Sequence, residues 1–136
     1  MAIEAALLVP AVMVFLAVAV AVGRVETLSG TVDESARTAA RTLSLDRSWT
    51  TVEEAKVVAT KAVNEVLAQQ GVSCPATTVD VHLGTLPGTA AGTLDTVAVD
   101  VSCTTTVLDL LPAKWVPASV TLTGHFSSVK DHYRSQ

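Results

Sequence analysis

The 136-residue sequence predicts an α+β fold that begins with one long helix and continues with a second helix and a small three-stranded antiparallel sheet. Three successive hydrophobic patterns support this prediction. An unbroken apolar run comes first, apolar residues then recur every three or four positions, and after Gly71 they recur at every second position. These patterns are typical of a membrane-spanning helix, an amphipathic helix and a strand, respectively. We therefore expect three parts: the transmembrane half of the first helix at 1–23, its amphipathic half at 24–45, and a small α+β domain at 46–136.

The apolar run at 5–22 contains no charged or strongly polar side chain. As a helix it spans roughly 27 Å, close to the hydrocarbon thickness of a bilayer. Glu4 stands at its start and Pro10 lies inside it. A carboxylate at the edge of such a segment is costly unless it stays at the interface or finds a partner, so Glu4 is a functional candidate. The alternative is an ordinary signal anchor whose acidic residue lies among the lipid headgroups.

The charges that flank the apolar run bear on its orientation. No Lys or Arg precedes the run, whereas Arg24, Arg37 and Arg41 follow it, and a count of positive charges alone places the domain in the cytoplasm. Long domains, however, cross membranes largely regardless of their charge. A cleavable secretory signal with a small-residue site at 17–19 is a further alternative, but the apolar core is long for that role and a basic start is missing. We expect a single-pass membrane protein with an extracytoplasmic domain.

The helical pattern continues beyond Gly23, so we expect a single helix of about forty residues. On its polar side Asp33 and Arg37 are neighbours at one turn, and Glu34 and Arg41 are neighbours at two turns. The opposite side is a narrow apolar face made mostly of small residues, namely Val25, Leu28, Val32, Ala36, Ala39, Ala40 and Leu43.

A second helix is predicted after a break at 45–49. Thr50 and Glu53 form a capping-box pattern that opens it, and Gly71 is placed to end it. One apolar stripe runs along this helix and is typical of core packing: Val52, Ala55, Val58, Ala59, Ala62, Val63, Val66 and Leu67.

Three segments show the two-residue alternation of strands, at 79–83, 97–103 and 120–126. The first two are joined by a connection at 84–94 that is rich in Gly, Pro and Thr, which predicts a β-hairpin with a long loop. An apolar turn is expected at 107–115, before the third strand.

The hairpin register follows from the apolar residues, which are odd-numbered in both strands. Pairing Val79 with Val99 and Val81 with Val97 places both apolar sets on one face of the sheet. This is the register that we expect.

The two cysteines, Cys74 and Cys103, are expected to form one disulfide. An even pair in a chain with a membrane-targeting segment indicates an oxidising compartment. Cys103 falls on the inward face of its strand, and Cys74 precedes Pro75 outside the regular strand, so the two sulfurs can meet at the open end of the hairpin. Two reduced core cysteines are the alternative.

Several functional classes have little support in the sequence. The net charge is −4, no basic run is present and aromatic residues make up only 4%, so we expect no nucleic-acid partner. No nucleophile motif of the G-x-S-x-G type and no glycine-rich phosphate loop occurs, so we expect no catalytic residues, no cofactor and no enzyme activity.

Four polar residues at or near the outward face of the hairpin are of the types that bind metal ions. Asp80, His82 and Asp100 share that face, and His125 lies on a nearby strand. Such side chains are metal ligands in principle. Solvated polar residues normally occupy this face, however, and no short His-x-His or C-x-x-C spacing is present. We therefore predict no metal site.

The chain resembles the TadE/TadF-like minor pilins of tight-adherence (Tad) pilus systems. The segment at 3–6, Ile-Glu-Ala-Ala, is similar to the V-E-x-A start of that family, and Pro10 follows inside the apolar run. The Ala/Arg-rich segment at 35–41 resembles the one that follows the family's membrane helix. A V-x-V-x-V strand, then Leu-Pro at 111–112 and a final strand, complete the likeness, which is specific at the N-terminus and loose in the sheet.

This resemblance implies a type IV pilin-like fold and a structural role in the assembly, initiation or capping of a Tad-type pilus. The implied partners are other pilin subunits and the pilus assembly machinery, contacted through the N-terminal helix, together with membrane lipid. Glu4 and Pro10 are the implied assembly residues. In the family a prepilin peptidase cuts after a glycine and the acid lies near position five of the mature chain; here the acid is at position four and no glycine precedes it.

Two other functions remain open at this point. The first is a single-span, membrane-anchored extracytoplasmic domain that binds a ligand or adheres without polymerising. The second is a pseudopilin of a secretion system. In a pilin the N-terminal helix packs among similar helices, whereas in the membrane-anchored binding domain it lies in lipid alone.

Overall fold

The computed structural model describes residues 2–87, 93–106 and 119–130. Helix α1 spans Ala2–Leu45 and helix α2 spans Val52–Gln69. Strands β1 (Ala76–Pro87), β2 (Thr93–Thr106) and β3 (Ser119–Val129) form one antiparallel sheet in the order β1-β2-β3. The predicted α+β arrangement of a long apolar helix, a second helix and a three-stranded sheet is confirmed. The apolar turn predicted at 107–115 lies outside the described residues.

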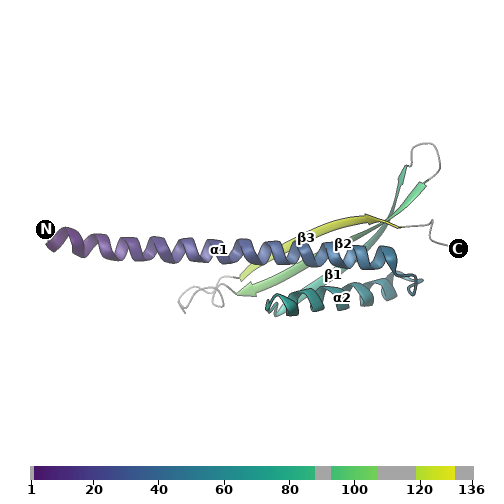
Figure 1. Cartoon of the computed structure of the whole chain (residues 1–136), viewed down its shortest axis with the longest axis horizontal. Coiled ribbons are helices and arrows are strands. Elements are labelled where there is room, and N and C mark those ends of the chain that lie inside the picture. The colour runs from purple at the N-terminus through teal and green to yellow at the C-terminus, as the bar shows by residue number, and fades with distance from the viewer. Residues whose placement is uncertain (1, 88–92, 107–118, 131–136) are drawn as a thin grey trace.

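The domain has two layers, with the helices packed on one face of the sheet (Figure 1). Helix α1 contacts β2 and β3, helix α2 contacts β1, and the two helices pack on each other. Only the C-terminal part of α1 takes part in these contacts, while its N-terminal part projects beyond the domain (Figure 1). The other face of the sheet is covered by neither helix.

The core lies between these two layers and is built from the predicted apolar faces. Small residues dominate the contribution of α1, and β2 contributes its odd-numbered residues from Val97 to Thr105, which are almost fully buried. The core residues from the helices and from β1 and β2 include Val32, Ala36, Ala39, Ala40, Leu43, Ala55, Ala59, Val63, Leu67, Val79, Val81, Val97, Val99, Val101 and Cys103.

The small side chains of α1 allow the helix to lie close to the sheet, and the closest approach is at Gly124 of β3. A Cβ atom on this glycine would lie 2.8 Å from the carbonyl oxygen of Val32 and 3.0 Å from the Cα of Asp33. Glycine inside a strand often marks such an approach of another backbone. Gly124 therefore fixes where β3 crosses α1.

The hairpin register differs from the prediction by two residues. Val79 pairs with Val101 and Val81 pairs with Val99, rather than with Val99 and Val97. A shift of two residues leaves every side chain on its original face, so the apolar pattern does not distinguish the two registers. The strands are also longer than predicted, since β1 and β2 include 84–87 and 93–94 of the expected 84–94 loop.

The capping box of α2 is also displaced, by one residue. The N-cap is Thr51, whose hydroxyl accepts the backbone N–H of Glu54 at 3.3 Å, rather than the predicted Thr50 with Glu53. The carboxylate of Glu54 in turn accepts the backbone N–H groups of Thr50 at 2.7 Å and Thr51 at 3.1 Å. Both T-x-x-E patterns occur one residue apart in the sequence, so the spacing alone left the choice open.

The other end of α2 follows the prediction. Gly71 adopts a φ of 67°, the left-handed conformation that glycine favours after a helix. The backbone N–H of Val72 donates to the carbonyl oxygen of Leu67 at 2.9 Å, which closes the last turn.

Candidate functional site

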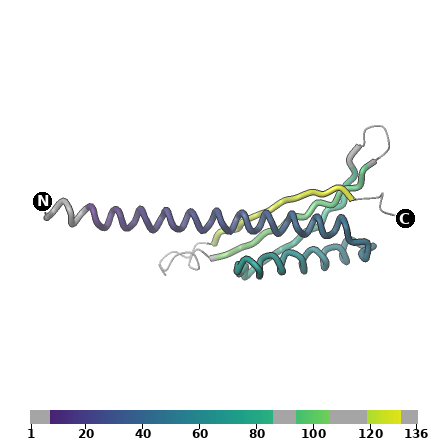
Figure 2. Tube along the Cα trace, viewed as in Figure 1, coloured from purple at the N-terminus to yellow at the C-terminus, as the bar shows by residue number. Residues whose placement is uncertain are grey.

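The projecting half of α1 is the candidate functional site. Helix α1 contains 44 residues and passes through Pro10 without interruption (Figure 2). Proline removes one backbone hydrogen bond from a helix, which membrane helices tolerate better than soluble helix interiors. Glu4 lies in the first turn of the helix, where the macrodipole favours a negative charge. The structure thus places both candidate residues, Glu4 and Pro10, on the part of α1 that projects from the domain.

Large apolar side chains are exposed on every side of this projecting half. They follow one another along the helix, and each exposes more than half of its surface: Leu8, Val9, Val12, Met13, Val14, Phe15, Leu16, Val18, Val20 and Val22. At 3.6 residues per turn these positions cover the whole circumference, which is typical of a helix surrounded by lipid or by other apolar helices.

In the described part of the chain, this helix is long and apolar enough to cross a membrane, and its most apolar segment has no side chain buried against the domain. Burial begins at Thr31 and Val32, where α1 reaches the sheet. One helix thus has an apolar half without a buried side chain in the described part of the chain and a second half that forms part of the core.

The two charge pairs predicted on the polar side of α1 are not formed. Among the described residues no ion pair joins Asp33 to Arg37 or Glu34 to Arg41. Instead, the guanidinium of Arg37 lies 5.2 Å from the ring centroid of Phe126 on β3. Glu34 and Arg41 are two turns apart, about 10.5 Å along the axis, which explains why they do not meet.

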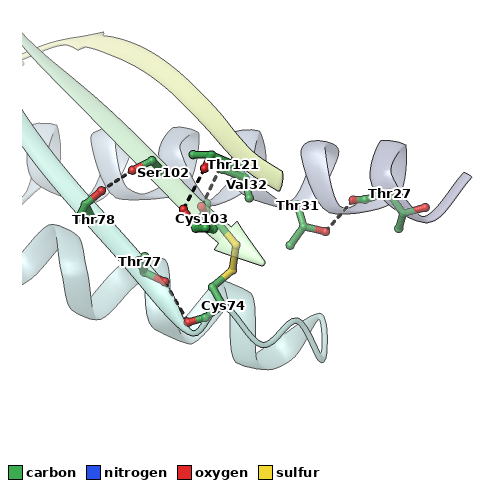
Figure 3. Close-up of a disulfide and its surroundings, with 11 residues drawn as sticks. Thr27, Thr31, Val32, Cys74, Thr77, Thr78, Ser102, Cys103 and Thr121 are labelled. Atoms are coloured by element: carbon green, nitrogen blue, oxygen red, sulfur yellow. Dashed lines mark hydrogen bonds between the residues drawn. A yellow bond between two sulfur atoms is a disulfide. The ribbon is translucent and has the colours of Figure 1, made fainter. Parts of the chain in front are cut away.

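The cysteines lie as predicted, at disulfide distance. The sulfur atoms of Cys74 and Cys103 are 1.96 Å apart and their Cα atoms 5.6 Å apart. Figure 3 shows the bond joining the segment between α2 and β1 to the inward face of β2. Thr77 supports this junction, because its hydroxyl donates to the carbonyl oxygen of Cys74 at 3.5 Å.

The outward face of the sheet brings together the polar residues considered as metal ligands. Asp100 lies at the centre, with Nδ1 of His125 at 2.5 Å and Nε2 of His82 at 3.4 Å from its carboxylate oxygens. Asp80 pairs instead with Lys56 of α2 at 3.0 Å, which raises the pKa of that lysine. Within the described ranges, no group of three or more His, Cys, Asp or Glu residues is arranged to hold a metal ion.

One contact that the sequence did not indicate fixes the end of α1. The indole N–H of the buried Trp49 donates to the carbonyl oxygen of Leu43 at 3.1 Å. The ammonium group of Lys130 lies 4.2 Å from the Trp49 ring centroid. The position of Trp49 just after a predicted helix end was the only signal for this role. Through it, the α1–α2 connection is held against the residue that follows β3.

Comparison of the chain with protein-family models, with curated proteins and with solved structures finds no match. A functional conclusion therefore depends on the residues and geometry described above.

Proposed function

We propose that the protein is a membrane-anchored structural subunit, a minor pilin that takes part in the assembly, initiation or capping of a Tad-type pilus. The observation that carries this proposal is the division of α1 into two halves. Among the described residues its apolar half has no buried side chain, and its second half is part of the domain core.

This division matters because it joins the domain rigidly to the anchor. Buried residues from Thr31 to Ser44 fix α1 against the sheet, and no break separates them from the apolar half. A domain that only needed a tether would function equally well on a flexible linker. A subunit that must be positioned by packing of its N-terminal helix among similar helices requires this continuity.

Glu4 has a specific role in the proposal. In a bundle of apolar helices, its carboxylate pairs with the terminal amine of a neighbouring subunit. A buried pair of this kind contributes more to register than to net stability, which suits the alignment of subunits. Membrane lipid surrounds the same helix before assembly, and the domain lies on the extracytoplasmic side.

The first test is mass spectrometry of the native protein's N-terminus, from membranes and from filaments sheared off the cell surface. We expect a mature chain that starts within a few residues of Glu4 and is recovered with the filaments. An unprocessed protein confined to the membrane would contradict the proposal and favour a membrane-anchored binding domain. Recovery with a secretion complex instead of surface filaments would favour a secretion pseudopilin.

The second test addresses Glu4 directly. Glu4→Ala is expected to reduce co-isolation with other pilin subunits while leaving the protein in the membrane. Glu65→Ala is the matched control, because it removes an equivalent charge from the exposed surface of α2. Unchanged co-isolation of the Glu4→Ala protein would remove this residue from the assembly mechanism.

A further inference from the structure

A stripe of residues on α1 faces away from the domain. Successive helical residues are rotated by about 100°, so Gly23, Gly30, Glu34 and Arg41 fall within an arc of about 40°. This arc is opposite the buried face that contains Val32. All four residues are exposed, and we call them the outward stripe.

The charges of the outward stripe have no partner within the described chain. The side chains of Glu34 and Arg41 make no ion pair or hydrogen bond with any described residue. The acid lies nearer the apolar half and the base nearer the domain's far end, two turns apart. The stripe thus presents one negative and one positive position that a partner with the same spacing can complement.

No described residue packs against the Cβ side of the two glycines in the outward stripe. A Cβ on Gly23 or Gly30 would meet no atom within 4 Å, in contrast to Gly124. In an exposed helix interior each glycine is less favourable than alanine. Small residues on a helix surface do, however, allow a second helix to approach closely. The two glycines are separated by seven residues, the same spacing that separates Glu34 from Arg41.

We propose that the outward stripe packs against the outward stripe of a second copy of this chain, with the helices parallel and offset by seven residues, about 10.5 Å. This offset places Gly23 of one copy beside Gly30 of the other. It also places Glu34 beside Arg41, so that each helix supplies one member of an intermolecular ion pair. The inference rests on the proposed function and names the partner and the contact.

The charges select this arrangement over the two simpler ones. A parallel pair in register would place Glu34 opposite Glu34 and Arg41 opposite Arg41, and like charges repel. An antiparallel pair would send the two apolar halves in opposite directions, so they could not share one membrane. The offset pair meets neither objection.

The offset also indicates where the contact forms. The apolar run spans roughly 27 Å. If one copy stays centred in the bilayer, an offset of about 10.5 Å places more than a third of the apolar run of the other copy outside the bilayer. Two copies resting side by side in the membrane are thereby kept from this contact. It suits copies that are leaving the bilayer, as subunits do when they enter a filament.

Cross-linking of the purified full chain in detergent tests the offset, because a micelle does not hold both helices at one depth. Val12→Cys lies within the same arc and Ala19→Cys about 20° beyond its edge, seven residues apart, and both leave the four stripe residues intact. A thiol-specific bismaleimide leaves the native disulfide closed. Differently tagged Val12→Cys and Ala19→Cys chains, mixed together, are expected to cross-link at least threefold more than either variant with itself. Equal or stronger self-cross-linking would overturn the offset.

Charge reversal tests the ion pair in the same mixture. Glu34→Arg alone or Arg41→Glu alone is expected to lower the cross-link yield about threefold to tenfold, because each variant replaces one exposed ion pair by two like charges that repel. The double variant Glu34→Arg/Arg41→Glu restores the opposite charges and is expected to restore the yield. A double variant as weak as the single ones would overturn the proposal.

The two proposals can fail separately. A chain recovered with sheared filaments that gives no mixed cross-link would overturn this contact and leave the proposed function intact. A chain that cross-links as expected but never leaves the membrane would refute the proposed function alone.

Discussion

Gly124 provides the sharpest test of how α1 is joined to the sheet. In Gly124→Ala the new methyl carbon would lie 2.8 Å from the carbonyl oxygen of Val32 and 3.0 Å from the backbone N and Cα of Asp33. All three are backbone atoms, so no rotamer change relieves the contact and β3 must move away from α1. Overpacking of this kind costs about 1–3 kcal/mol. Alanine also restricts the unfolded chain, which recovers about 0.4–1 kcal/mol.

We therefore expect Gly124→Ala to lower the free energy of unfolding by about 1–2 kcal/mol. Urea unfolding of the full chain in detergent, followed by Trp49 fluorescence in a Trp115→Phe background, measures this change. With a urea dependence of about 1–3 kcal/mol per molar, the midpoint falls by roughly 0.3–2 M.

Gly30→Ala is the matched control for this prediction. It is the same substitution at a glycine whose new Cβ meets nothing within 4 Å. In a helix interior alanine is favoured over glycine by about 1 kcal/mol, so the midpoint is expected to stay the same or rise. A Gly124→Ala protein with a midpoint at or above that of the unmodified chain would refute the proposed close approach of α1 and β3.

Three further predictions concern the disulfide, the cap of α2 and the membrane helix. Replacing Cys74 and Cys103 by Ser opens a loop with a sequence separation of 29. Unfolding free energies are expected to fall by about 3–4 kcal/mol, and an unchanged value would mean that the bond is not formed in the protein. Hydrogen bonds from the backbone and side chain of the preceding threonines hold the pKa of Glu54 below its ordinary value. The ionised Glu54 carboxylate therefore stabilises the fold fully above the pKa that Glu54 has in the unfolded chain, and this stabilisation is lost as the pH falls through the pKa in the folded chain. Glu54→Gln should thus flatten the pH dependence of the unfolding midpoint below about pH 5. Leu16→Arg places a charge in the apolar half of α1, at a cost of about 2.5–3.5 kcal/mol if that half spans a bilayer. The variant should therefore raise the fraction of the protein that alkaline carbonate extracts from membranes. Val57→Arg, on the exposed surface of α2, should leave that fraction unchanged.

Most of the secondary structure could be predicted because each element carries a strong period. The apolar run and the following small-residue face predicted one long helix, and α1 extends from Ala2 to Leu45. Alternation predicted the inward faces of β1, β2 and β3. Predictions were wrong where the same local pattern occurs twice, as in the two T-x-x-E patterns that begin at Thr50 and Thr51. The hairpin register failed for the same reason, since pairing Val79 with Val101 or with Val99 buries the same face.

Contacts between segments that are distant in the chain could not be predicted from the sequence. Gly124 interrupts the apolar alternation of β3, which indicates a close approach but not the backbone that approaches. The meeting of Trp49 with Lys130, and that of Arg37 with Phe126, depends on where β3 ends and where it crosses α1. Local periodicity carries no information on either point, because both are set by tertiary packing.

The two faces of α1 have separate physical roles, and this makes folding and assembly separable by mutation. The face that contains Val32 and Leu43 is fully buried, so its substitutions act on the stability of the domain. The charged side chains of the outward stripe are exposed and make no ion pair or hydrogen bond with a described residue, so Glu34→Arg and Arg41→Glu should leave the free energy of unfolding within about 0.5 kcal/mol of the original. A loss of filament incorporation by these variants at unchanged stability would locate the effect in the contact between subunits. A matching loss of stability would show instead that the stripe has a role in folding, and that α1 does not divide its faces in this way.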